Sequence, residues 1–252
     1  MKKIFYSILV FLLILLNFST VCADDVDNEV DFEDTIEVTA SNVSELPKTN
    51  SRRYIVYDRI SKSMIIGKNE DIKSAMASTT KIMTTIVILE KADLNETVTV
   101  SAKAGGTGGS RLGLKRGDKA SVRDLLYGLM LRSGNDAAVA LAEHVGGSVK
   151  EFAELMNEKA IELGLTNTHF VTPHGLDDAN HYTTALELAK LTDYAMNNET
   201  FSKIVGTKSI TIYINNQPRQ INNTNELLGV LNGVVGVKTG FTNNAGRCLV
   251  TE

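Results

Sequence analysis

The middle of the chain carries apolar residues at helical spacing, and both ends carry short runs of β-prone residues. The first helical segment follows Ser78 and is apolar on nearly all sides, through Ile82, Met83, Ile86, Val87 and Leu89. A helix that is apolar all round is buried. We therefore expect this segment to lie in the core.

Cap signals and breaks mark four further helices. Ser121 precedes an apolar stretch that ends at Ser133-Gly134-Asn135, and another helix is predicted over residues 136–145. Capping boxes at Ser148-x-x-Glu151 and Thr184-x-x-Glu187 predict helices that continue to about residues 164 and 197. In the first of these two helices, the residues expected to face inward are Phe152, Leu155, Met156, Ile161 and Leu163.

Runs rich in β-branched and aromatic residues predict strands near both ends of the chain. Residues 53–58 and 63–67 are expected to form a hairpin, and residues 97–100 a short strand. Later strands are expected over residues 209–214, 219–222, 234–238 and 248–250. Strands on either side of a helical block indicate an α+β fold, in which the N- and C-terminal strands share one sheet and the helices pack around it.

Residues 1–23 have the pattern of a secretory signal peptide. Lys2 and Lys3 precede the apolar run 4–18, and Val21-Cys22-Ala23 favours cleavage after Ala23. An uncleaved membrane anchor is the alternative; Cys22 also raises lipidation, although Ser19-Thr20-Val21 is a poor lipidation signal. Residues 24–50 are acidic and short of aromatic residues, which predicts a flexible leader, and the folded domain is expected over residues 51–252.

Composition narrows the functional classes. Loss of Lys2 and Lys3 with the signal would change the net charge from −4 to −6, so no basic surface for nucleic acid is indicated. Only Cys248 would remain, which leaves no intrachain disulfide. An exported protein works without ATP, and hydrolysis or binding is therefore expected.

Candidate chemistry begins with Ser78 and Lys81, at the start of the buried helix. Positions i and i+3 of a helix lie on one face, so the lysine amine is expected to reach the serine hydroxyl. A lysine that burial keeps neutral can take the proton of that hydroxyl and make it a nucleophile. A capping serine followed by a solvent-facing lysine is the alternative.

Other polar groups fall at breaks in the apolar pattern. Ser133 and Asn135 lie on the tight turn between two helices, which is also an ordinary connector sequence. The Gly-rich run 105–110 lacks the signature of a phosphate-binding loop and is interpreted as a mobile surface loop. The histidines lack metal-binding spacing and are interpreted as structural or surface residues: His144, His169, His174 and His181.

A late strand is predicted to end in Lys238-Thr239-Gly240. Lys238 can offer a positive charge to a substrate carboxylate and help keep Lys81 neutral, and Thr239 offers a hydroxyl. Gly240 leaves room for an extended substrate along the strand. A simple strand-terminating turn is the alternative for these three residues taken alone.

Taken together, the three motifs resemble a known set. Ser-x-x-Lys, Ser-x-Asn and Lys-Thr-Gly occur in this order in β-lactamases and penicillin-binding proteins. The segments 77–84, 133–137, 173–177 and 236–242 resemble the D-alanyl-D-alanine carboxypeptidases, the low-molecular-mass penicillin-binding proteins, and the resemblance runs from about Arg53 to the last residue. It implies a β-lactamase/DD-peptidase-like fold, an antiparallel sheet flanked by a helical cluster.

The resemblance also implies roles for single residues. Ser78 would be the acylated nucleophile and Lys81 its general base; Ser133 would relay a proton to the leaving D-alanine, and Asn135 would hold the substrate amide and the lysine. Lys238, Thr239 and Gly240 would bind substrate, and the backbone N–H groups of Ser78 and Phe241 would form the oxyanion hole. No metal or cofactor is implied. The expected partners are peptidoglycan stem peptides ending in D-Ala-D-Ala, β-lactams and, peripherally, the outer face of the membrane.

The chain departs from the family pattern where it stops, at Glu252. Further strands, a packing helix and a downstream arginine are expected from the family, so the domain is predicted to be incomplete at its C-terminal end. Two other functions stay open: a catalytically impaired binding remnant, and a class A β-lactamase. The latter needs a glutamate on a loop, whereas Glu151, Glu154 and Glu158 fall in a helical pattern.

Overall fold

The computed structural model describes residues 49–252. The predicted signal peptide and nearly all of the acidic leader lie outside these residues. The chain divides into two units, and the second, Ile55–Glu252, contains all the elements described below except the first residue of β1. Within the described residues, no helix has both the length and the apolar character needed to cross a membrane.

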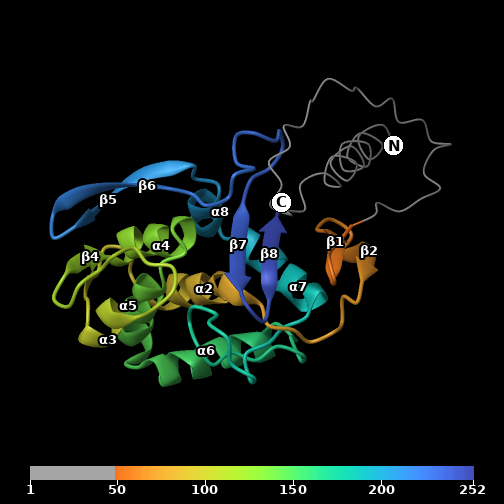
Figure 1. The fold of residues 1–252 in the computed structure, drawn as a ribbon, viewed down its shortest axis with the longest axis horizontal. Helices are drawn as coiled ribbons and strands as arrows, with labels where there is room; N and C mark the ends of the chain where they lie inside the picture. The colour runs from red at the N-terminus through yellow and green to blue at the C-terminus, as the bar shows by residue number, and fades with distance from the viewer. Residues whose placement is uncertain (1–48) are drawn as a thin grey trace. The chain divides into compact units, whose positions relative to one another are not determined.

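Helix α2 (Lys81–Lys91) is the central element of the helical part (Figure 1). All its residues from Lys81 to Ile88 are buried, as the apolar pattern predicts. Five helices contact it: α4 (Val122–Leu131), α5 (Asn135–Gly146), α6 (Val149–Glu162), α7 (Ala185–Met196) and α8 (Glu199–Val205). The prediction of a buried helix after Ser78 is confirmed.

Side-chain caps set where the helices begin. The hydroxyls of Ser121, Ser148 and Thr184 each accept a hydrogen bond from the backbone N–H three residues later, as predicted for α4, α6 and α7. Two short helices were not predicted: α3 (Ala102–Gly106) and α8, which Asn198 caps. The inward orientation expected for Ile161 is wrong, because that side chain is 78% exposed.

Within residues 49–252 the strands form four two-stranded sheets instead of one large sheet. The pairs are β1 (Tyr54–Asp58) with β2 (Ser63–Lys68), β3 (Thr97–Thr99) with β4 (Lys119–Ser121), β5 (Ser209–Ile214) with β6 (Gln217–Asn222), and β7 (Val237–Thr242) with β8 (Gly246–Thr251). The short strand β4 was not predicted. The hairpin of residues 53–67 is confirmed, but the expected sheet shared by the N- and C-terminal strands is wrong.

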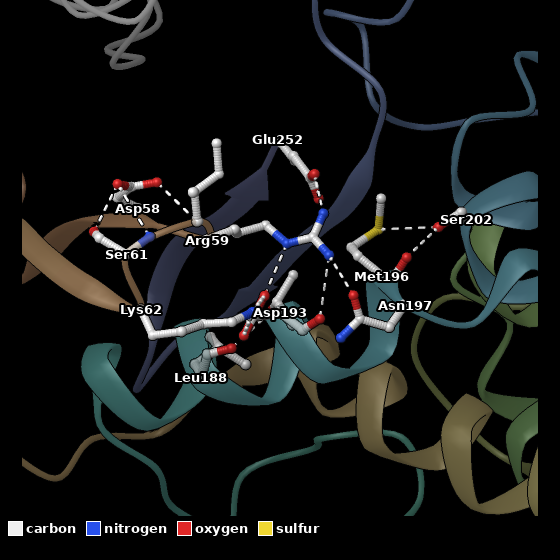
Figure 2. A network of polar contacts seen from close by, with 12 residues as sticks. Asp58, Arg59, Ser61, Lys62, Leu188, Asp193, Met196, Asn197, Ser202 and Glu252 are labelled. Atoms are coloured by element: carbon white, nitrogen blue, oxygen red, sulfur yellow. Dashed lines mark hydrogen bonds and ion pairs between the residues drawn. The ribbon is translucent and has the colours of Figure 1, made fainter. Parts of the chain in front are cut away.

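Side chains at the turn of the β1–β2 hairpin contact helix α7, as Figure 2 shows. The Nε of Arg59 donates to Asp193 at 2.9 Å, and the Nζ of Lys62 donates to the same carboxylate at 2.8 Å. Arg59 also forms an ion pair with Glu252. Burial would raise the pKa of Asp193, but the hydrogen bonds from Lys62 and Arg59 outweigh it and lower that pKa. Polar side chains at the hairpin turn therefore contact α7 and the C-terminal Glu252.

Candidate active site

The turn that carries Ser78 is a 3₁₀ helix, Ala77–Thr80, directly before α2. Ala77 has φ +47°, an uncommon value for a residue with a side chain. The hydroxyls of Thr79 and Thr80 donate to the carbonyls of Met76 and Ala77, at 2.5 and 2.8 Å. These bonds hold a strained turn, and Ser78 remains partly exposed on it while its neighbours are buried.

Lys81 is fully buried, and its Nζ has three oxygen neighbours. They are the Ser78 Oγ at 3.0 Å, the Asn135 Oδ1 at 2.7 Å and the His174 carbonyl oxygen at 2.9 Å. The amide and carbonyl oxygens can only accept, so each receives an N–H of the amine. A neutral amine then has its lone pair left for the Ser78 hydroxyl.

The electrostatics of the pocket favour that neutral amine. Burial lowers the pKa of Lys81 well below its ordinary 10.5, and the positive charge of Lys238 lowers it further. The carboxylate of Asp136 acts in the opposite direction. Lys81 therefore combines proximity to a hydroxyl with a reduced affinity for protons, which are the two properties of a general base.

Asn135 is the first residue of α5 and is held by a loop that sequence reasoning placed on the surface. Its backbone N–H donates to the Ser110 carbonyl and its Nδ2 to the Gly108 carbonyl, both at 2.8 Å. A Cβ at Gly109 would lie 2.6 Å from that Nδ2. Residues 106 and 108–110 are exposed, as expected of a surface loop, but residues 105 and 106 belong to α3, and the carbonyls of Gly108 and Ser110 also orient Asn135.

The buried carboxylate of Asp136 fixes the continuation of this loop. It accepts the backbone N–H groups of residues 112, 113 and 114 at 2.7 to 2.9 Å. Ser133 lies just before, between α4 and α5, with φ +55° and only 7% exposure. Sequence reasoning missed the role of Asp136; its position directly after Ser133-Gly134-Asn135 was the available signal.

The segment 172–176 covers the other side of Lys81. Besides the His174 carbonyl, the Pro173 carbonyl accepts the Thr84 hydroxyl at 2.7 Å. Gly175, at φ +85°, lies so close that a Cβ would be 1.8 Å from the Ala77 carbonyl oxygen. Sequence reasoning treated His174 as a structural or surface residue and missed this contact, because a backbone carbonyl has no side-chain signature.

Strand β7 brings Lys238, Thr239, Gly240 and Phe241 to the Ser78 turn. A Cβ on Gly240 would lie 2.9 Å from the Ser78 backbone nitrogen, so the strand crosses directly over that residue. Lys238 is 1% exposed; burial lowers its pKa to about 7, and its Nζ donates to the Thr239 carbonyl at 2.9 Å. The Phe241 side chain is 65% exposed.

The predicted position of the Lys-Thr-Gly triplet within its strand needs correction. The strand begins at Val237, so the triplet lies inside β7 and not at its end. Just before the strand, the Gly236 carbonyl accepts the Nδ2 of Asn225 at 2.8 Å and the Thr251 hydroxyl at 3.0 Å. The triplet therefore pairs with β8 along its whole length, and Lys238 faces Val250 in the register.

All the predicted residues come from three regions of the chain that meet at Ser78. Direct hydrogen bonds join Ser78, Lys81 and Asn135; Gly240 contacts the Ser78 turn, and Ser133 stands two residues before Asn135. Glu151, Glu154 and Glu158 are exposed on α6. Within residues 49–252, no group of three or more His, Cys, Asp or Glu residues is arranged to hold a metal ion.

Solved structures share this fold. A variant of the Streptomyces K15 DD-transpeptidase aligns with a TM-score of 0.78 at 35% identity, over 81% of this chain and 86% of that one. A penicillin-binding protein homologue from Mycobacterium tuberculosis aligns with the same TM-score at 34% identity, over 83% of this chain and 80% of that one. The predicted α+β, DD-peptidase-like fold class is confirmed.

Curated relatives carry a consistent name. D-alanyl-D-alanine carboxypeptidase DacF of Bacillus subtilis is 38% identical over 79% of this chain and 52% of its own length, and the enzyme of that name from Streptomyces K15 is 40% identical over 73% and 69%. The chain spans about half the length of the first of these relatives. The family model described as D-alanyl-D-alanine carboxypeptidase matches residues 39–252. The chain belongs to the D-alanyl-D-alanine carboxypeptidase family, peptidase family S11.

Proposed function

We propose that the chain is a serine-type D-Ala-D-Ala carboxypeptidase that removes the terminal D-alanine of peptidoglycan stem peptides. One observation supports this most directly: the Lys81 Nζ lies 3.0 Å from the Ser78 Oγ while two carbonyl-type oxygens occupy its N–H donors. An amine held in this way accepts a proton from the hydroxyl. The family and the names of its members supply the substrate class.

Acylation begins with proton transfer from the Ser78 hydroxyl to Lys81. The Oγ attacks the carbonyl carbon of the penultimate D-alanine, and the oxyanion is held by the backbone N–H groups of Ser78 and Phe241. When the peptide bond breaks, the leaving nitrogen receives the proton of Lys81 through the Ser133 hydroxyl. The Lys81 amine is then neutral again, and the products are free D-alanine and a Ser78 ester.

Deacylation repeats the sequence with water. Lys81 takes a proton from a water molecule, the hydroxide attacks the ester carbonyl, and Ser78 leaves with the proton that Lys81 returns. Lys238 and Thr239 hold the terminal carboxylate of the substrate, and the strand edge at Gly240 accepts the extended peptide. Asn135 orients both the lysine and the substrate amide.

The same steps account for inhibition by β-lactams. The strained amide of the β-lactam takes the place of the D-alanyl-D-alanine bond, and its opening leaves the acyl group on Ser78. The leaving nitrogen stays attached to the acyl group, so it blocks the approach of water. We infer that penicillins acylate Ser78 and that hydrolysis of the resulting penicilloyl ester is slow.

The cellular setting follows from the proposed substrate. Residues 1–23 act as an export signal, and residues 51–252 form the peptidase domain, outside the cytoplasmic membrane. Peptidoglycan and the outer face of that membrane are the expected surroundings. The observation behind this proposal is the sequence pattern of Lys2, Lys3 and the apolar run that follows.

The deciding experiment measures the intact mass of the purified protein with and without benzylpenicillin, beside Ser78→Ala. The expected result is a penicilloyl adduct that the substitution abolishes, together with D-alanine released from a peptide ending in D-alanyl-D-alanine. An adduct without D-alanine release would assign the chain to the binding-remnant class. Rapid hydrolysis of penicillin would instead indicate a β-lactamase.

A further inference from the structure

A polar recess of about 260 Å³ lies next to the candidate site and has no part in the mechanism above. Three arginines line it, Arg111, Arg132 and Arg219, together with the amides Gln220 and Asn222 and two apolar side chains. The chain as a whole carries a net charge of −4. Three arginines that line one recess are therefore a local feature and not part of a generally basic protein.

The positive charge in the recess is uncompensated. Within residues 49–252 none of the three guanidinium groups forms an ion pair, and no carboxylate lines the recess. Like charges held close together repel one another. A bound anion would remove that repulsion, and a guanidinium fork fits the two oxygens of a carboxylate.

Two of the arginines are already oriented by the backbone. Arg219 donates from Nη1 to the Leu112 carbonyl at 2.6 Å, and Arg111 donates to the Gly105 carbonyl. The backbone of Leu112 is itself fixed, because its N–H donates to the buried Asp136 at 2.8 Å. Each guanidinium has five donors, so most of them remain for a ligand.

Each wall of the recess continues into the candidate site. Arg111 follows Ser110, whose carbonyl holds Asn135, and Arg132 directly precedes Ser133. Asn222 is two residues before Thr224, whose hydroxyl is 2.9 Å from that of Thr239. These adjoining residues connect the recess to the candidate site.

We propose that Arg111, Arg132 and Arg219 form an anion-binding subsite for a carboxylate of the peptide substrate other than the terminal D-alanine carboxylate. This inference rests on the proposed function, since it takes the ligand to be an acidic stem peptide. The subsite would favour peptides with a free α-carboxylate on the glutamyl residue over peptides in which that group is amidated.

Binding to the non-acylating Ser78→Ala protein tests the subsite without turnover. Titration calorimetry would compare L-Ala-γ-D-Glu-L-Lys-D-Ala-D-Ala, with its glutamyl carboxylate free, and the same peptide amidated at that carboxylate. We expect Arg132→Gln and Arg219→Gln each to weaken binding of the free-acid peptide about tenfold, the size of one charge-assisted contact. Binding of the amidated peptide should be unchanged.

Two matched variants separate the subsite from general effects. Arg123→Gln removes the same charge from an exposed position of α4 outside the recess and should change neither affinity. Arg219→Lys keeps the charge but loses the fork, and should give an intermediate loss. The proposal is overturned if the arginine variants bind both peptides as the parent does. It is also overturned if glycerol phosphate competes equally with both peptides, because that result assigns the recess to phosphate.

The two proposals fail in distinguishable ways. A penicilloyl adduct on Ser78 together with D-alanine release, but no arginine effect, leaves the peptidase function standing and removes the subsite. Absence of an adduct, with peptide binding that still depends on the arginines, removes the catalytic proposal and retains the subsite.

Discussion

At the scale of single residues, two buried lysines set the proton balance of the site. Burial lowers the pKa of Lys238 to about 7, so its positive charge is present mainly below pH 7. That charge is the second cause, after burial, of the lowered pKa of Lys81. The base of the proposed mechanism is therefore kept neutral in part by the residue that is proposed to bind the substrate.

This arrangement predicts the pH dependence of acylation. Benzylpenicillin should acylate the protein more slowly as the pH falls through the pKa of Lys81, because a protonated amine cannot accept the Ser78 proton. In Lys238→Met the neighbouring charge is absent, so the pKa of Lys81 rises and the acid limb moves to higher pH. Stopped-flow measurement of the acylation rate between pH 5 and 10 checks this; an unmoved limb in the variant would contradict it.

A second residue-scale feature is the hydrogen-bond chain through His181. The Val171 N–H donates to its Nδ1 at 3.0 Å, so the proton lies on Nε2, which donates to the Thr80 hydroxyl at 2.7 Å. Thr80 in turn donates to the Ala77 carbonyl at 2.8 Å. Burial lowers the pKa of His181 to about 4, which keeps this neutral form over the working range.

We expect His181→Ala to leave the partly buried Val171 N–H without its acceptor and to remove the donor to the Thr80 hydroxyl. Unfolding free energy should fall by about 2 kcal/mol and acylation by about tenfold. His181→Gln retains a donor and an acceptor and should recover part of both. Thermal unfolding and penicillin acylation measure the two effects; full acylation in the alanine variant would show that the chain does not position Ser78.

At the scale of elements, the site is built where loops and a strand press against one helix start. The segment 172–176 supplies carbonyls to α2, and its Gly175 leaves no room for a side chain beside Ala77. Strand β7 likewise leaves no room for a side chain at Gly240, beside the Ser78 backbone. These close approaches depend on glycine for space as well as for conformation.

Alanine substitutions at two glycines with positive φ distinguish the need for space from the need for a left-handed backbone conformation. Gly175→Ala puts a Cβ 1.8 Å from a carbonyl oxygen, whereas Gly164→Ala, at φ +69°, meets no atom within 4 Å. The control should lose about 1 kcal/mol of stability from backbone strain alone. Gly175→Ala should lose considerably more, along with acylation. Equal unfolding temperatures for the two variants would contradict the packing argument.

At the scale of the whole molecule, local signals predicted more than long-range pairing did. Caps and apolar spacing located the major helices, and the three motifs indicated Ser78, Lys81, Asn135 and Gly240. How the elements associate depends on contacts between distant residues, such as that of Arg59 with Asp193 on α7, that no local pattern contains. The contacts of the Gly108 and His174 carbonyls could not be predicted for a different reason: every residue has a backbone carbonyl, so the sequence does not mark the ones that bind side chains.

Gly240 packs against the Ser78 turn, although it lies about 160 positions after Ala77 in the sequence. A chain that is still unfolded therefore has no assembled site and, under the proposed function, should not react with penicillin. A fluorescent penicillin would therefore label only folded molecules. In a urea titration, labelling should disappear with the same midpoint as the circular dichroism signal, which measures the loss of helix. Labelling that outlasts the loss of helix would show that the site is formed by a smaller part of the chain. The drug would thus serve as a reporter of folding.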